Sequence, residues 1–323
     1  MNYQAPWWLP GGNLQTIVAA KLARPYAGSA PVFRRERWRT PDQDFIDVDW
    51  LDTTTFAGAP LWVMFHGLEG SSSSHYALAC AQLARDQGFA FAVAHFRGCS
   101  GELNLAPRAY HSGDYQEIAW ILERMRKAHT GPIFAIGISL GGNALLRWAQ
   151  EAGPTAGAQV SAVAAVCSPI DLAASGRAIG RGFNRQVYTR MFLRSMVPKA
   201  LAKLRQFPGL FDAQALRAAR DLYEFDNVFT APLHGFRDTE DYWHRASAKP
   251  HLERIRIPAL VLNARNDPFI PADCLPAPAS VGQYVTLWQP AQGGHVGFPT
   301  GAPPGKATAL PQALSAWFSQ HRV

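Results

Sequence analysis

Short apolar segments alternate with amphipathic ones along most of the chain, beginning at Leu61. The apolar segments have the length of buried strands, whereas the segments between them repeat apolar residues every three or four positions, as helices do. The pattern predicts strands at 61–66, 89–96, 132–139 and 160–171, and helices at 76–85, 112–127 and 140–150. Such alternation is typical of a parallel sheet covered by helices on both faces.

The alternation stops at Asp171 and resumes near Ile257. Two further strands are predicted at 257–267 and 284–290, followed by a closing helix near 310–318. The roughly 80 residues in between mix helix and loop patterns, which is typical of an insertion rather than of one long loop. We therefore expect a core split by a cap: core, first part, at 1–171 with an N-terminal extension at 1–30; cap insertion at 172–253; core, second part, at 254–323.

Composition limits the class of protein. Of the 323 residues, 48% are hydrophobic and 17% charged, which predicts a sizeable core. There is no run of 18 apolar residues, and the opening lacks the basic and apolar regions of a secretory signal. The cysteines form no C-x-x-C pair, so a reduced protein is expected. These features favour a cytoplasmic location, with peripheral contact to the inner membrane as an option.

The positive charge is concentrated in one place. The chain has a formal net charge of +7, and the segment from Leu172 to Phe211 holds eight basic residues and no acidic one. One basic segment does not indicate nucleic acid as a partner, as a chain basic throughout would. Arg177, Arg181 and Arg185 recur every four residues, which predicts one helical face. This face is either simply solvated or docks on an anionic membrane, and the sequence leaves both open.

The stretch Phe134–Leu146, FAIGISLGGNALL, contains a candidate nucleophile. Ser139 stands where an apolar strand ends and a helix begins, with Gly137 and Gly141 on either side. This strand–Gly-x-Ser-x-Gly–helix context is typical of a nucleophile elbow, in which a sharp turn exposes the serine hydroxyl. We therefore expect Ser139 to be a catalytic nucleophile, which needs a base and an orienting acid.

Chain order selects the other members of the site. In folds with such an elbow the acid and then the histidine follow the serine. His295, in a glycine-rich loop after the last strand, fits the base better than His321 near the chain end. Asp267 and Asp171 both end predicted strands, and Asp267 is the favoured acid because its strand directly precedes the one that leads to His295.

An oxyanion hole needs two backbone N–H groups. We expect one from Leu140, directly after the nucleophile, and one from Leu68, in the HGLEG loop after the first long strand. Arg97 is expected to tie loops together rather than to bind substrate. There is no metal-ligand spacing, P-loop or dinucleotide fingerprint, so no metal or cofactor is predicted.

Several motifs together resemble the YheT-like branch (AB hydrolase 4 type) of the α/β-hydrolase superfamily. They are PWWLPGGNLQT, HGLEGSSSSHY, FRGCSGELN, YHSGD, GISLGGN and DNVFTAPLHGFRDTEDYWHRAS, in this order along the chain. The resemblance implies an α/β-hydrolase fold, with a mostly parallel sheet of about eight strands and an inserted helical cap. It also implies a Ser-Asp-His triad at the positions above and hydrolysis of carboxylic esters, either short-chain esters or acyl lipids. An acyltransferase with the same acyl-enzyme, or a lipid-binding protein with weak hydrolase activity, are the alternatives.

Overall fold

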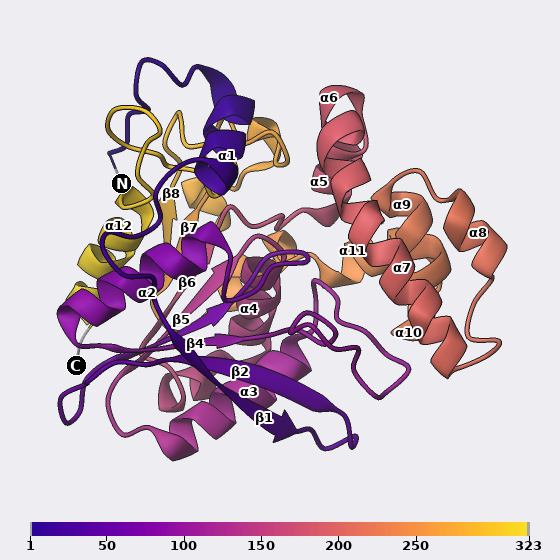
Figure 1. Ribbon diagram of the computed structural model, residues 1–323, viewed down its shortest axis with the longest axis horizontal. Coiled ribbons are helices and arrows are strands. Elements are labelled where there is room, and N and C mark those ends of the chain that lie inside the picture. The colour runs from indigo at the N-terminus through magenta and orange to yellow at the C-terminus, as the bar shows by residue number, and fades with distance from the viewer. Residues whose placement is uncertain (1, 322–323) are drawn as a thin grey trace.

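The computed structural model describes residues 2–321. It contains one eight-stranded sheet with the strand order β1-β2-β4-β3-β5-β6-β7-β8 (Figure 1). The strands are β1 (Phe33–Arg39), β2 (Phe45–Leu51), β3 (Leu61–Phe65), β4 (Ala90–Ala94), β5 (Ile133–Ile138), β6 (Ala162–Val166), β7 (Ala259–Leu262) and β8 (Val285–Trp288). The six strands from β3 to β8 are parallel to one another, as the alternating pattern predicts.

The first two strands are absent from the sequence-based prediction, which places no strand before Leu61. β1 and β2 form an antiparallel pair at one edge of the sheet, and β2 continues antiparallel to β4. Charged residues dominate β1 because it is an exposed edge strand, and they pair across to β2. Arg35 contacts Asp49 at 2.7 Å and Arg37 contacts Asp47 at 2.8 Å. These paired charges hide the apolar alternation that marks an ordinary strand.

Helices cover both faces of the sheet. α3 and α4 pack with Val63 and Phe65 on one face, and α2 and α12 pack with Trp62 and Met64 on the other. This arrangement follows from the alternation of side chains along β3. The helices of these layers are α2 (His75–Gln87), α3 (Tyr115–Ala128), α4 (Leu140–Ala152) and α12 (Ala309–Phe318).

The remaining helices are α1 and those of the cap. α1 (Gly11–Lys21) lies in the N-terminal segment. The cap helices all lie between β6 and β7 in the chain and form the separate lobe that Figure 1 shows beside the core. They are α5 (Leu172–Ile179), α6 (Gly182–Asn184), α7 (Arg190–Gln206), α8 (Ala213–Ala218), α9 (Leu222–Phe225), α10 (Ala231–Leu233) and α11 (Thr239–Ala246). A π-helical turn, Arg185–Thr189, joins α6 to α7.

The basic segment does not form the single helical face that its spacing predicts. α5 ends at Ile179, and Arg181 has an extended backbone with φ −127° and ψ 154° before the next helix begins. Arg177 therefore belongs to a different helix from Arg185, and it faces Glu240 at 3.7 Å. The prediction is wrong because a four-residue spacing indicates one face only when the helix is continuous.

Within residues 2–321 no helix is both long enough and apolar enough to cross a bilayer.

Candidate active site

Ser139 lies in the tight turn between β5 and α4. Its backbone has φ 50° and ψ −118°, a conformation that residues other than glycine rarely adopt. The flanking glycines make room for this turn. A Cβ atom on Gly137 would lie 2.4 Å from the Cα atom of Gly142, and one on Gly141 would lie 2.5 Å from the carbonyl oxygen of His66. The G-x-S-x-G spacing thus reflects close backbone packing around the exposed hydroxyl.

Ser139, His295 and Asp267 are joined by hydrogen bonds. The His295 Nε2 atom lies 3.0 Å from Ser139 Oγ, and Nδ1 lies 2.8 Å from Asp267 Oδ2. The Asp267 side chain is fully buried, and its other oxygen accepts the N–H of Phe269 at 2.8 Å. Since the carboxylate can only accept, Nδ1 carries the proton and Nε2 is free to accept from the serine hydroxyl. The structure therefore brings together the three predicted residues in the geometry of a nucleophile, a base and an orienting acid.

Asp171, the alternative acid, has a different environment. Its Oδ1 atom accepts the N–H of Ala174 at 3.0 Å and so caps the start of α5. Its Oδ2 atom lies 3.3 Å from the ammonium group of Lys249. In the described part of the chain no hydrogen bond joins Asp171 to His295. The contacts of this aspartate instead stabilise the start of α5, where the cap begins.

The N-terminal helix α1 braces the loops that carry Asp267 and His295, a role the sequence analysis misses. Gln15 is fully buried, and its side-chain oxygen accepts from Asn266 Nδ2 at 3.0 Å and from the N–H of Gly293 at 2.8 Å. Thr16 Oγ1 accepts the N–H of His295 at 2.8 Å. The only sequence signal is the GNLQT motif, which the family resemblance includes without assigning it a role.

Gly12 allows α1 to approach these loops. A Cβ atom at this position would lie 1.8 Å from the carbonyl oxygen of Asn266, so a larger residue would push the helix and the acid loop apart. The brace therefore depends on backbone contact as well as on the polar side chains of α1.

A buried thiol lies beside the site. Cys167, Asp267 and His295 each offer a possible ligand atom, and these atoms lie within 4.8 Å of one another. Burial raises the pKa of the Cys167 thiol well above its usual value, so it is a neutral thiol rather than a thiolate ligand. It accepts the N–H of Val296 at 3.2 Å. These features fit a role in packing against the loop that carries His295.

The HGLEG loop passes directly beside the nucleophile. A Cβ atom on Gly67 would lie 3.3 Å from that of Ser139. Burial lowers the pKa of His66 to about 3, so its imidazole is neutral. Its Nε2 atom accepts the N–H of Phe96 at 3.0 Å, which puts the proton on Nδ1, where it is donated to the carbonyl of Gly67 at 2.7 Å. In a trans peptide the carbonyl and the next N–H point in opposite directions, so His66 also sets the direction of the Leu68 N–H.

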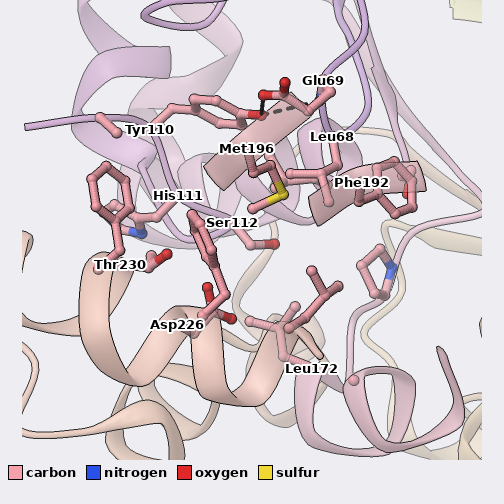
Figure 2. A pocket seen from close by; sticks show the side chains of 18 of the residues that line it. Leu68, Glu69, Tyr110, His111, Ser112, Leu172, Phe192, Met196, Asp226 and Thr230 are labelled. Carbon is pink, nitrogen blue, oxygen red and sulfur yellow. Dashed lines mark hydrogen bonds between the residues drawn. The ribbon is translucent and has the colours of Figure 1, made fainter. Parts of the chain in front are cut away.

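A pocket of about 1180 Å³, its open mouth included, lies between the strand ends and the cap. Ser139, His295, Leu68 and Leu140 line it on the core side. The cap side is mainly apolar, and Figure 2 shows Leu172, Phe192 and Met196 among the side chains around the cavity. The apolar cap residues of the wall include Leu172, Ile179, Phe192, Met196, Phe225 and Phe229. Such a wall suits an acyl chain or another apolar substituent.

Asp226 and Ser175 are two of the polar residues in the cap wall, which also include Lys199, Lys203, Thr230 and Tyr242. Asp226 is partly buried, accepts from Trp243 Nε1 at 2.9 Å and has no basic partner within residues 2–321. Burial raises the pKa of its carboxyl group to about 6. Ser175 Oγ is buried and has no hydrogen-bond partner in the described structure.

Comparison with known proteins identifies the class to which this fold and site belong. The sequence model of the α/β hydrolase fold matches residues 60–302, so the chain belongs to the α/β-hydrolase family. It is 38% identical to the candidate esterase YheT of Escherichia coli over 290 residues, which cover 88% of this chain and 84% of YheT. The YheT-like branch expected from the motifs is thereby confirmed.

Other relatives have names that refer to lipids. Phospholipase ABHD3 of Mus musculus is 30% identical over 90% of this chain and 72% of its own length. Monoacylglycerol lipase of Saccharomyces cerevisiae is 27% identical over 84% of this chain and 61% of its own length. Among solved structures, the esterase PF2001 of Pyrococcus furiosus has a TM-score of 0.57 at 13% identity over 94% of this chain and 98% of that chain, which shows the shared fold. The relatives support ester hydrolysis as the general activity.

Proposed function

We propose that the protein is a serine hydrolase that cleaves carboxylic esters through an acyl-enzyme on Ser139. The observation that supports this most directly is the hydrogen-bonded series Ser139–His295–Asp267 at the end of an apolar pocket. His295 takes the proton of Ser139 as the hydroxyl oxygen attacks the acyl carbon, and then gives it to the departing alcohol. Water, deprotonated by the same imidazole, cleaves the acyl-enzyme and restores the serine.

The negative oxygen of each tetrahedral intermediate needs two donors, which we assign to the N–H groups of Leu68 and Leu140. Leu140 is the first residue of α4, so its N–H has no partner within the helix. Leu68 lies in the loop that packs beside Ser139, and both residues line the pocket. Preorganised donors of this kind stabilise the charge as it develops, without reorganisation during the reaction.

Short-chain esters and acyl lipids are the proposed substrates, because the cap wall is mainly apolar and the pocket opens to solvent. The test is a panel of esters from acetyl to long-chain, with acylglycerols and phospholipids included, on the purified protein and on Ser139→Ala. We expect the variant to lose hydrolysis and labelling by a fluorophosphonate probe. Labelling retained by Ser139→Ala would refute the assignment. An added alcohol that captures the acyl group instead of water would identify an acyltransferase.

We also propose that the cap contacts anionic membranes. Three apolar residues, Phe183, Val187 and Met191, are 53%, 37% and 45% exposed and recur every four positions. Arg181, Arg190 and Arg194 are exposed in the same segment, which has no acidic residue. This stripe of apolar and basic side chains complements an anionic lipid surface, where each basic residue adds about 1 kcal/mol. The cytoplasmic location remains a prediction.

Cosedimentation with vesicles of graded anionic-lipid content tests the contact. Changing the three cap arginines to Gln should abolish binding at low salt. The matched control removes three exposed basic residues from the core: Arg39, Lys127 and Arg254. Equal loss of binding in both triple variants would show that only net charge matters and would refute docking through the cap.

A further inference from the structure

One ion pair joins the basic segment of the cap to the HGLEG loop. Lys199 Nζ, on α7, lies 2.8 Å from Glu69 Oε2. The side chain of Glu69 is only 11% exposed and that of Lys199 is 38% exposed, so the pair is partly shielded from water. Within residues 2–321, Lys199 is the only one of the eight basic residues of this segment that forms an ion pair with the core.

The backbone of Glu69 has an unfavourable conformation, which contacts of its side chain and N–H group stabilise. Its φ of 57° lies in the left-handed region, which is unfavourable for a residue other than glycine. Tyr110 holds it from the core side: the Tyr110 hydroxyl accepts the Glu69 N–H at 3.0 Å and donates to Glu69 Oε1 at 3.0 Å (Figure 2). Lys199 binds the other carboxylate oxygen, so the side chain is held between a core tyrosine and a cap lysine.

The position of Glu69 in the chain gives this contact a consequence for the reaction. Glu69 directly follows Leu68, whose N–H we assign to the oxyanion hole. His66 fixes the peptide on one side of Leu68, through the Gly67 carbonyl, and the held Glu69 fixes the residue on the other side. A shift in the Glu69 backbone would therefore turn or move the Leu68 N–H.

We propose that the Lys199–Glu69 ion pair couples the cap to the oxyanion hole, so that the Leu68 N–H is correctly aimed only while α7 lies over the pocket. This inference rests on the proposed function. Lys199 and Glu69 are positioning residues: they act through the loop and not on the substrate. The cap thereby contributes to the rate of the reaction as well as to the shape of the pocket.

A second contact between α7 and the core makes it possible to distinguish positioning of the HGLEG loop from mere attachment of the cap to the core. Lys203, one turn further along α7, donates to the carbonyl oxygens of Asn104 and Ala106 at 2.5 and 2.9 Å. This contact with the core does not involve the HGLEG loop. Variants of Lys199 or Glu69 therefore keep α7 anchored and change only the hold on the loop.

The experiment compares Lys199→Gln, Glu69→Gln and Lys199→Arg with the wild type on a soluble short-chain ester. We expect both Gln variants to lower kcat by about 10- to 100-fold, less than loss of a whole oxyanion donor, with KM changed less than twofold. Affinity for a trifluoromethyl ketone, which forms an oxyanion on the serine, should fall by the same factor. Lys199→Arg, which keeps the cation, should restore most of the rate.

Arg205→Gln is the matched control, since it removes one exposed positive charge from the same helix. It should leave kcat, KM and the inhibitor affinity unchanged, and an equal loss in this variant would overturn the proposal. So would a rise in KM with kcat preserved in the Gln variants, because the pair would then only shape the pocket. If the wild type itself is not labelled by a fluorophosphonate, the proposed function fails; labelling of the wild type with unchanged kcat in both Gln variants refutes the ion-pair proposal alone.

Discussion

Arg97 in the core and Lys203 in the cap are both buried cations, but they are bound in different ways. Arg97 donates to three carboxylates, those of Glu117, Asp44 and Asp42, at 2.6, 2.8 and 2.7 Å. Lys203 donates to two backbone carbonyls and lies 5.7 Å from the centre of the Phe207 ring, and burial lowers the pKa of its ammonium group to about 8.

Acidic side chains of the two regions differ in their partners, although burial raises the pKa of Glu117 to about 7 as it raises that of Asp226 to about 6. Asp44 and Glu117 of the core share the guanidinium of Arg97, whereas Asp226 of the cap has neutral donors and no cation within the described residues. Arg97 also lines the pocket, but its donors are used by the carboxylates, as expected of a residue that ties loops together. The buried cation of the core is thus paired with carboxylates, whereas Lys203 and Asp226 of the cap have no oppositely charged hydrogen-bond partner among the described residues.

The prediction with the largest expected effect tests whether the catalytic acid is Asp267 of the core or Asp171 at the start of the cap. Asp267→Asn should lower kcat by about 10⁴-fold, because an amide at this position stabilises the wrong tautomer of His295. Asp171→Asn, at the start of the cap, should change stability and kcat little, because the amide oxygen can still accept the N–H of Ala174 and cap α5. Steady-state kinetics on one soluble ester measure both. The reverse ranking would assign the acid to Asp171.

The second prediction compares the two buried cations. Arg97→Met leaves the buried carboxylate of Asp44 and the buried Glu117 side chain without their guanidinium partner and should lower the free energy of unfolding by about 3–5 kcal/mol. Lys203→Met leaves the carbonyls of Asn104 and Ala106 without this donor, but it also removes an ammonium group that is costly to bury. The free energy of unfolding should therefore fall by only about 1–2 kcal/mol. Urea unfolding of the two variants measures the difference. Similar losses would contradict the contrast between core and cap.

The third prediction concerns the effect of the Asp226 carboxyl group, in the cap, on the pH dependence of stability. The pKa of Asp226 is raised from 3.8 to about 6, so the folded state binds more protons than the unfolded state between these values. Its contribution to stability is therefore lost as the pH rises through this range, and above pH 6 the buried charge costs about 3 kcal/mol. Asp226→Asn should be nearly neutral at pH 4 and stabilise the fold by up to about 3 kcal/mol at pH 8.

Chemical unfolding of Asp226→Asn at several pH values measures this effect. Asp86→Asn, at an exposed site on α2, is the control and should stay within about 0.5 kcal/mol at each pH. An Asp226→Asn variant that is equally destabilised at pH 4 and pH 8 would show that burial does not raise the pKa of this carboxyl group.

Local sequence patterns determined the parallel sheet and the three residues of the hydrogen-bonded series. Strands β3 to β7 are mostly buried runs whose apolar character is visible without knowledge of their neighbours, and β8 is a partly exposed edge strand whose sequence is also mainly apolar. The elbow at Ser139 is also local, since its glycines and serine lie within five positions. The order of Asp267 and His295 along the chain follows from the strand order of the fold.

Tertiary structure alone decided the features that join distant segments. Gln15 and Gly293 are 278 positions apart, and no local pattern predicts that they are in contact. The same is true of Glu69 and Lys199, and of the charges that pair the edge strand β1 with β2. Hydrophobic periodicity records which side of an element is buried, but not which polar group on another element will face it. That pairing depends on how the completed core orients its loops, and it is this packing that places α1 behind the histidine loop and the cap over the pocket.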